Sequence, residues 1–303
     1  MLKSYWKALL LVITLIFSCL SFAGVSEWVD FELKNGHIKI PVKLSGIDTY
    51  ALLDTGAQGN SINPNFVRKH GLQFTKGQRF RVTGVFGEEM RRAYNNVPTT
   101  IFGADLELDD LIPVNLGGTE TGLLIGSGFF SRFIVQFDYP NQRMRIVTRD
   151  VLRLGDIENI KVESQRGSGE PLVRVSFGED SDPFWVLLDT GSNGGLLIER
   201  SLARKHNLLE KITSSSMSSG VNSTAITENL RVEELIFGPF TLENVLVSVP
   251  AEGESANLVD QNRLTGSRIK SRKQEGILGY DVLKHFVLTL DYRAGHAHIS
   301  LPE

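Results

Sequence analysis

The sequence predicts an all-β protein built from two similar lobes with a cleft between them. Two observations support the all-β class: apolar and polar residues alternate over short runs, and glycine, asparagine and proline separate those runs. A third observation supports two lobes, because Leu-Leu-Asp-Thr-Gly occurs at 52–56 and again at 187–191. The length of 303 residues is enough for two domains of ordinary size. We therefore expect two closed, barrel-like lobes, a few short helices and an interlobe cleft.

The N-terminal segment is typical of an export signal. Lys3 and Lys7 precede an apolar run that is short for a membrane span, and a small-residue cleavage motif ends at Ala23. We expect 1–23 to be a signal peptide, and the mature protein to be exported, periplasmic or secreted, without stable insertion in a membrane. An uncleaved membrane anchor and lipidation of Cys19 are the alternatives.

The composition narrows the class of protein. A hydrophobic content of 41% and a charged content of 22% fit a globular protein with a real core. The formal charge of -3 becomes -5 without 1–23, whose only charged residues are two lysines, so no nucleic-acid partner is expected. Cys19 is the only cysteine, which leaves the mature chain without disulfide or thiol chemistry and suits a bacterial periplasm.

Residues 24–150 are expected to form the N-terminal lobe. An Asn-Gly turn at 35–36 separates two strand-like runs, and another strand resumes at Tyr50 and leads into the first Asp-Thr-Gly. The later elements expected in this lobe are a short helix at 63–70, a glycine-marked hairpin at 82–87, two strands within 99–112, an apolar run at 123–126, a short helix at 127–133 and a terminal hairpin at 134–147.

Residues 170–303 repeat this order and are expected to form the C-terminal lobe. The segment 286–292 matches 133–139 position for position, with an apolar strand ending in Asp-Tyr in both copies. A tandem duplication explains this pattern. The polar, glycine-containing stretch 151–169 is the expected linker between the copies.

The second copy is longer mainly because of the stretch 251–275, which is rich in charged and small polar residues. One interpretation is a solvated surface loop. The other is a loop that borders the cleft and recognises acidic groups, or is itself clipped.

Asp54 and Asp189 each end an apolar strand, where a carboxylate is costly to bury unless it is paired or hydrogen-bonded. If a pseudo-twofold axis relates the lobes, the two equivalent loops meet and the two carboxyl groups face each other. Such a pair shares one proton. The ionised member activates a bridging water while the protonated member hydrogen-bonds a substrate carbonyl. This is general acid–base hydrolysis of an amide without a covalent intermediate.

The residues beside the aspartates suit this chemistry. Gly56 and Gly191 allow a tight turn and a close approach of backbone N–H groups to the carboxylates. Thr55 and Thr190 carry short hydroxyl groups that can hydrogen-bond across the axis and hold the two loops together.

Two more motifs accompany each expected lobe. The apolar-apolar-Gly segments that end in Ile125-Gly126 and Leu278-Gly279 can pack beneath the aspartate loops. A flap that folds over the cleft and excludes water is expected at the glycine-marked hairpin, with Gly220 as its counterpart in the other lobe. The flap residues are Gly84, Val85, Phe86 and Gly87.

With these motifs the chain resembles the clan AA aspartic proteases, as tandem retropepsin-like repeats in a two-lobed, pepsin-like architecture of the bacterial type. The resemblance covers 36–148 and 170–301. One Asp-Thr-Gly is a weak signal, but two copies, each preceded by Leu-Leu and followed by apolar-apolar-Gly, are a strong one. The resemblance implies an acid-protease fold and an aspartic endopeptidase with Asp54 and Asp189 as catalytic residues. Phe86 stands where the family's flap often carries a tyrosine, and it cannot donate a hydrogen bond.

The resemblance also implies a polypeptide substrate and a monomer with an internal pseudo-dimer. No metal or other cofactor is expected, since His296 and His298 form a candidate metal pair without an apparent third ligand. A non-catalytic peptide-binding or scaffolding module on the same fold is the alternative function, which the two intact Asp-Thr-Gly motifs disfavour. Pairing of lobes between chains is disfavoured because a linker gives pairing within the chain a high effective concentration.

Overall fold

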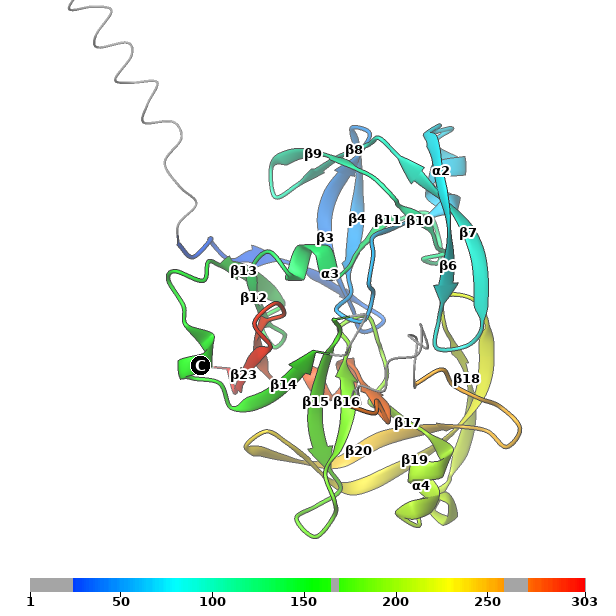
Figure 1. Cartoon of the computed structure of the whole chain (residues 1–303), viewed down its shortest axis with the longest axis vertical. Coiled ribbons are helices and arrows are strands. Elements are labelled where there is room, and N and C mark those ends of the chain that lie inside the picture. Colours follow the sequence, from blue (N-terminus) through cyan, green and yellow to red (C-terminus); the bar gives the residue numbers. More distant parts are fainter. Residues whose placement is uncertain (1–23, 165–168, 259–271, 303) are drawn as a thin grey trace, which may run out of the picture.

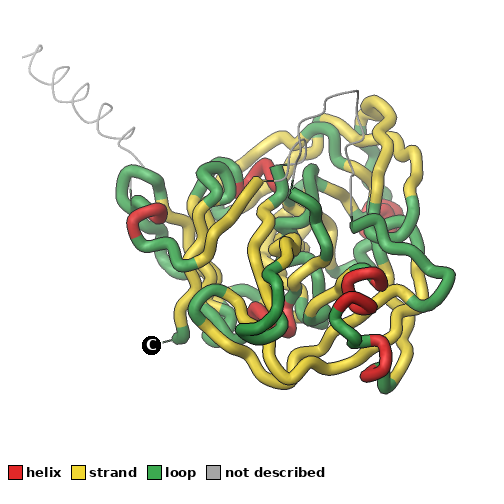
Figure 2. Tube along the Cα trace, turned by 60° about the horizontal axis from the view of Figure 1, so that its bottom comes forward, coloured by secondary structure: helices red, strands yellow, loops and turns green. Residues whose placement is uncertain are grey.

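The computed structural model describes residues 24–164, 169–258 and 272–302, and the predicted signal peptide lies outside them. Strands dominate the described chain, and its helices are short (Figure 2). Two large sheets of 13 and 8 strands and a separate two-stranded hairpin make up the described fold. The predicted all-β, two-lobed class is confirmed. Among the described helices, none has the length and apolarity that a membrane span requires.

The elements repeat in the two halves of the chain. Strands of the first half are β1 (Val29–Asp30), β2 (Glu32–Lys34), β3 (His37–Leu44), β4 (Ile47–Leu53), β5 (Ser61–Ile62), β6 (Thr75–Thr83), β7 (Glu88–Asn95), β8 (Val97–Ile101), β9 (Ala104–Leu108), β10 (Ile112–Pro113), β11 (Thr121–Ile125), β12 (Ile134–Asp138) and β13 (Arg143–Val147). Strands of the second half are β14 (Ile160–Ser164), β15 (Pro171–Ser176), β16 (Phe184–Leu188), β17 (Leu196–Ile198), β18 (Ser214–Ser219), β19 (Thr224–Phe237), β20 (Phe240–Pro250), β21 (Gly276–Leu278), β22 (Val287–Asp291) and β23 (His296–Ser300). The short helices are α2 (Pro64–Lys69), α3 (Ser127–Phe130), α4 (Arg200–Lys205) and α5 (Tyr280–Leu283), with 3-10 turns η2 (Leu154–Asp156) and η3 (Leu209–Lys211).

The first lobe is built on the sheet β10-β5-β11-β4-β3-β8-β9, with β2 as an eighth strand paired to β3, and it occupies the upper part of Figure 1. The buried and less buried positions alternate along β3, as expected of a strand with one face in the core. Its neighbour β4 pairs in parallel with β11, so that Leu52 lies opposite Leu124 and Leu53 opposite Ile125. These paired apolar residues hold the first Asp-Thr-Gly at the end of β4.

The second lobe repeats this arrangement in the lower part of Figure 1. Strand β16 pairs in parallel with β21, so that Leu187 lies opposite Ile277 and Leu188 opposite Leu278. The two lobes therefore present their Asp-Thr-Gly loops on equivalent pairs of parallel strands. Beside this pair, β19 and β20 form a long hairpin that continues into β18.

A single sheet joins the two lobes. Strand β12 of the first half pairs antiparallel with β22 of the second, from Val135 opposite Leu290 to Asp138 opposite Val287. Strands β1 and β13 extend this sheet on one side and β23 and β14 on the other. Strand β14 falls within 151–169, the stretch that the sequence assigns to a linker.

The interlobe sheet carries an ion pair between the halves. Arg149 donates to both carboxylate oxygens of Asp291, with Nη2 to Oδ1 at 2.7 Å and Nε to Oδ2 at 2.9 Å. Burial alone would raise the pKa of Asp291, but the hydrogen bonds from Arg149 and from the Ala294 N–H hold it below its ordinary value. The ion pair thus fixes the end of the first half to the second.

The short helices follow the predicted positions with one difference. The helix predicted at 63–70 is α2, whose first turn is capped by the Asn63 side chain accepting from the Asn65 N–H. The helix predicted at 127–133 ends earlier, at Phe130. The backbone must extend again to enter β12, so the tight turn after α3 replaces its last predicted residues.

Candidate active site

Asp54 and Asp189 lie at the ends of two equivalent strands, β4 and β16. Each backbone N–H donates to the carbonyl that ends the parallel neighbour strand, from Asp54 to Ile125 at 3.0 Å and from Asp189 to Leu278 at 3.0 Å. The neighbour strand therefore fixes where each carboxyl group leaves its sheet. Both aspartates stay partly exposed, which leaves them accessible to water.

Thr55 and Thr190 join the two aspartate loops across the lobe boundary. Each backbone N–H donates to the hydroxyl of the other threonine, at 3.0 Å in both directions. The Thr55 hydroxyl donates to the Leu188 carbonyl at 2.7 Å, and the Thr190 hydroxyl donates to the Leu53 carbonyl at 2.9 Å. Both threonines are buried. Because these buried donors all find partners in the opposite lobe, the two loops are held as one unit.

Gly56 and Gly191 bring each loop against the carboxyl group of the other loop. A Cβ atom on Gly56 would lie 2.7 Å from Cγ of Asp189, and one on Gly191 would lie 2.3 Å from Cγ of Asp54. The N–H of Gly56 donates to Asp54 Oδ1 at 2.9 Å, and the N–H of Gly191 donates to Asp189 Oδ1 at 2.8 Å. The two carboxyl groups lie close enough that the negative charge of Asp189 raises the pKa of Asp54. The structure thus brings both aspartates to one place.

Two regions of the chain, 40–129 and 173–282, match the family model described as aspartyl protease. The chain belongs to the aspartyl protease family. No curated protein matches it. Each matched region contains one aspartate of the pair, which agrees with two family repeats in tandem.

In this member of the aspartyl protease family, Gly126 and Gly279 support the two loops from equivalent positions. A Cβ atom on Gly126 would lie 2.5 Å from the carbonyl oxygen of Ala57, and one on Gly279 would lie 2.6 Å from the hydroxyl oxygen of Ser192. Helix α3 begins directly after Gly126, and α5 directly after Gly279. The apolar-apolar-Gly motifs therefore lie against the aspartate loops, where any side chain would push the loops away.

The expected flap hairpin contacts a hairpin of the other lobe. Its turn, between β6 and β7, consists of Gly84, Val85, Phe86 and Gly87. The Ser223 hydroxyl donates to the Phe86 carbonyl at 2.6 Å, and the Asn222 side-chain amide donates to the Gly87 carbonyl at 3.0 Å. A Cβ atom on Gly220 would lie 3.4 Å from a ring carbon of Phe86. Each lobe thus contributes one hairpin, and the tips of β6–β7 and β18–β19 lie side by side (Figure 1).

The protein environment raises the pKa of both aspartates, but the contributions to the two shifts differ. Burial, followed by the negative charge of Asp189, raises the pKa of Asp54 well above its ordinary value. Burial also raises the pKa of Asp189, but the hydrogen bond with Asp54 opposes the rise. The backbone N–H groups of Gly191, Ser192 and Gly56 oppose it further. The two carboxyl groups therefore titrate as one coupled pair, and like charges this close favour a single proton shared between them.

His37 and Glu170 are residues near the pair that sequence reasoning missed. They occupy equivalent positions in the two lobes. His37 lies two residues before Lys39, which pairs with Leu52. Glu170 lies two residues before Leu172, which pairs with Leu187. Burial and the charge of Lys39 lower the pKa of His37, and a backbone hydrogen bond with Gly191 opposes the shift. Glu170 is buried at 1% exposure, and its charge adds to the rise in the pKa of Asp54. No repeat marks these positions, since the two lobes carry different residues there.

Tyr139 and Tyr292 are also close to the pair and were missed. Both side chains are buried, and burial raises the pKa of both phenols, with the charge of Asp189 next for Tyr139. The repeated Asp-Tyr, whose tyrosine directly follows β12 and β22, is the sequence signal that could have identified them.

The two C-terminal histidines are engaged elsewhere. His296 Nδ1 lies 2.6 Å from a carboxylate oxygen of Glu158, and His298 Nδ1 lies 2.6 Å from the Ile157 carbonyl oxygen. Within the described ranges, no group of three histidine, cysteine or acidic side chains is arranged to hold a metal ion.

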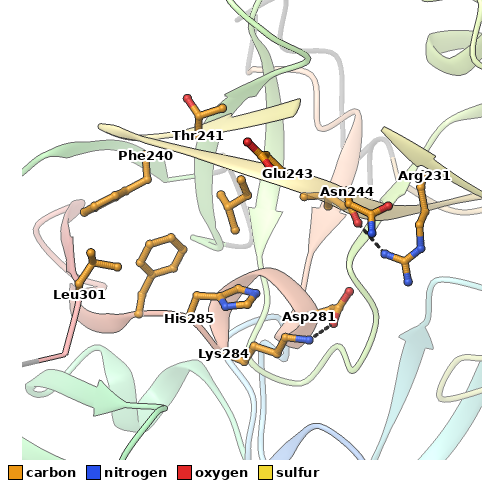
Figure 3. A pocket seen from close by; sticks show the side chains of 12 residues that line it. Arg231, Phe240, Thr241, Glu243, Asn244, Asp281, Lys284, His285 and Leu301 are labelled. Carbon is orange, nitrogen blue, oxygen red and sulfur yellow. Dashed lines mark hydrogen bonds and ion pairs between the residues drawn. The ribbon is translucent and has the colours of Figure 1, made fainter. Parts of the chain in front are cut away.

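A pocket of about 500 Å³ lies between β20 and the end of helix α5, apart from the aspartate loops (Figure 3). Three of its charged side chains have partners: Lys284 pairs with Asp281, and Arg231 donates to the Asn244 carbonyl. The other lining residues are Phe240, Thr241, Leu242, Glu243, Val245, His285, Phe286 and Leu301.

Proposed function

We propose that the protein is an aspartic endopeptidase that hydrolyses peptide bonds with a water molecule activated between Asp54 and Asp189. The observation that carries the proposal is the convergence of two carboxyl groups, one from each lobe, with each group lying against a glycine of the opposite loop. The substrate is an extended polypeptide, held between the aspartate loops and the two hairpins.

In the proposed mechanism the two carboxyl groups share one proton and take separate roles. The Asp189 carboxylate takes a proton from water, and the water oxygen bonds to the carbonyl carbon of the peptide. The Asp54 carboxyl group donates its proton to the carbonyl oxygen, which gives a neutral tetrahedral diol. Transfer of the proton from Asp189 to the peptide nitrogen then breaks the C–N bond. A carboxylic acid and an amine leave, and the proton of the second hydroxyl group returns to Asp54.

The Thr55–Thr190 hydrogen bonds support a catalytic role for the two carboxyl groups. Catalysis by positioned carboxyl groups requires that their separation be held within a fraction of an ångström. The exchanged hydrogen bonds at 3.0 Å supply that constraint without touching the substrate. We also propose that the protein acts outside the cytoplasm, in the periplasm or as a secreted protein, because of the export-signal pattern at 1–23.

The proposal is tested with purified protein that begins at Gly24 and an unstructured polypeptide as the substrate. Asp54→Asn and Asp189→Asn should each lower kcat by about 10²–10⁴-fold, because each removes one ionisable carboxyl group. A transition-state mimic with a statine-type hydroxyl group should inhibit the unmodified protein. Asp48→Asn, at an exposed aspartate of β4, is the matched control and should leave cleavage unchanged.

Full activity of Asp189→Asn would contradict the shared-water mechanism. If the unmodified protein binds the polypeptide without cleaving it, the peptide-binding module is the correct function instead.

A further inference from the structure

A segment of the second lobe crosses to the flap of the first lobe. It leaves β20 at Pro250 and reaches Asn257, whose backbone N–H donates to the Val85 carbonyl at 2.7 Å. The Asn257 side-chain amide donates to the carbonyl of Gly84 at 3.0 Å. Two carbonyl groups of the flap turn are therefore occupied by donors from the same chain.

The next residue, Leu258, is buried. It is 1% exposed and packs in an apolar cluster with Leu172, Leu187 and Ile277. These residues lie on β15, β16 and β21, the strands that support the Asp189 loop, and Leu187 is only two residues before Asp189. Residues at the edge of the cluster are Val85, Trp185, Leu197 and Ala256.

These contacts place the segment 256–258 between the flap of one lobe and the floor of the other. Val85 belongs both to the flap that Asn257 contacts and to the edge of the cluster that Leu258 fills. The segment therefore lies in the space that separates the flap from the strand leading to Asp189.

The first lobe has no equivalent segment among its described residues. There the connection between β10 and β11 is short, and it is tied to the start of helix α2. Asn63 donates to the Gly118 carbonyl at 2.9 Å, and Asn65 donates to the Gly117 carbonyl at 2.9 Å. The crossing segment thus comes from the part of the chain that is longer in the second lobe.

The contacts are those that a bound polypeptide makes. An extended peptide on a hairpin edge donates backbone N–H groups to its carbonyls and places alternate side chains in pockets. Here the N–H of Asn257 takes the place of the peptide donor, and the side chain of Leu258 takes the place of the pocket ligand.

We propose that 256–258 is a built-in pseudosubstrate, and that Leu258 fills an apolar subsite that accepts a leucine-like side chain of the polypeptide substrate. This inference rests on the proposed function for its meaning, but not for its test. The segment must leave before a substrate enters. The apparent association constant for substrate is therefore the intrinsic constant multiplied by the fraction of molecules in which the subsite is free. The preferred substrate is an extended peptide with a leucine-sized aliphatic side chain at this position.

The test measures binding, which needs no chemistry. A fluorescently labelled synthetic peptide with the sequence of 251–258 is titrated into protein that carries Asp189→Asn, with fluorescence anisotropy as the readout. Adding Leu258→Ala or Asn257→Ala should tighten binding about tenfold, because each variant weakens the resident segment. A peptide with aspartate in place of its terminal leucine should bind neither variant. Ser255→Ala, at an exposed position of the segment, should bind like its parent.

Two controls keep the result decisive. Asn257→Ala removes no buried apolar side chain, so its effect cannot come from damage to the core, and thermal unfolding checks that each variant is folded. Equal binding by all variants, or equal binding of the leucine and aspartate peptides, would overturn the inference.

A kinetic measurement separates this inference from the proposed function. If the protein cleaves polypeptides, Leu258→Ala should lower KM about tenfold at unchanged kcat, since the resident segment competes with substrate and takes no part in chemistry. An unchanged KM overturns the pseudosubstrate. Tight peptide binding in a protein without cleavage activity overturns the proposed function alone.

Discussion

Thr55 and Thr190 donate their backbone N–H groups to each other's hydroxyl oxygens, at 3.0 Å in both directions. The exchange has twofold symmetry although the chain does not. It holds the two aspartate loops at one separation, and it does so from buried positions that solvent and substrate do not reach.

Replacing Thr190 by valine should therefore destabilise the fold and impair the site. The change keeps the shape but removes a hydroxyl group, which leaves the N–H of Thr55 and the carbonyl of Leu53 without their buried partner. We expect a loss of about 1–3 kcal/mol in the free energy of unfolding for each such group, measured by urea denaturation. Thr190→Ser, which keeps the hydroxyl group, is the control and should retain most of the stability. Equal stabilities of the two variants would contradict the role assigned to the exchange.

Stability should depend on pH through Asp54. Its folded-state pKa lies above the ordinary value of 3.8, so the folded protein binds this proton more tightly than the unfolded chain does. The contribution to stability is complete below pH 3.8 and is lost as the pH rises through the raised folded-state pKa. Unfolding measured across this range should show that Asp54→Asn removes this part of the pH dependence. Activity should fall over the same rise in pH, because the proposed general acid loses its proton.

Asp291 should act in the opposite direction. Its pKa is held below the ordinary value, mainly by Arg149, so its contribution to stability is present above pH 3.8 and is lost as the pH falls through the lowered pKa. Arg149→Ala should reduce the free energy of unfolding at neutral pH by about 1.5–3 kcal/mol, since charged hydrogen bonds are lost from a buried carboxylate. Arg153→Ala, at an exposed arginine nearby, should change stability little. Similar effects of the two variants on stability would argue against the ion pair.

Gly191→Ala should disable the site while leaving the fold in place. The added Cβ atom would lie 2.3 Å from Cγ of Asp54, so the two carboxyl groups must move apart. A displacement on this scale costs about a hundredfold in kcat. Gly194→Ala is the matched control, because a Cβ atom there meets nothing within 4 Å. Steady-state kinetics of the two variants gives the comparison, and full activity of Gly191→Ala would rule out this packing.

The contact between the two hairpins should govern how often the expected flap, the β6–β7 hairpin, opens. The Asn222 side chain of the second lobe donates to the carbonyls of Val82 and Gly87 in the first lobe, at 2.8 and 3.0 Å. Asn222→Ala should raise hydrogen exchange of the backbone amides in 82–88, measured by mass spectrometry. Ser215→Ala, near the base of the second hairpin, should leave that exchange unchanged. No increase for Asn222→Ala would show that other contacts hold the flap closed.

The sequence predicts the parts of the site that occur in both copies of the repeat. The aspartates, threonines and glycines of both loops are identical in the two copies, so the pattern itself indicates that they act together. The flap contacts are not predictable in this way, because Asn222 and Ser223 bind backbone carbonyls that no sequence pattern marks. The position of Leu258 depends on a connection that is long in only one copy. A single apolar residue in a polar loop does not indicate which apolar cluster it joins.

The equivalent positions of His37 and Glu170 have a consequence for how such a chain can evolve. Two identical subunits would have to place the same side chain at both positions, an imidazole twice or a carboxyl group twice. Fusion of the two copies into one polypeptide removes that obligation. The surroundings of the two aspartates can then differ, as with the Glu170 charge that raises the pKa of Asp54, and each copy can specialise toward donating or accepting a proton.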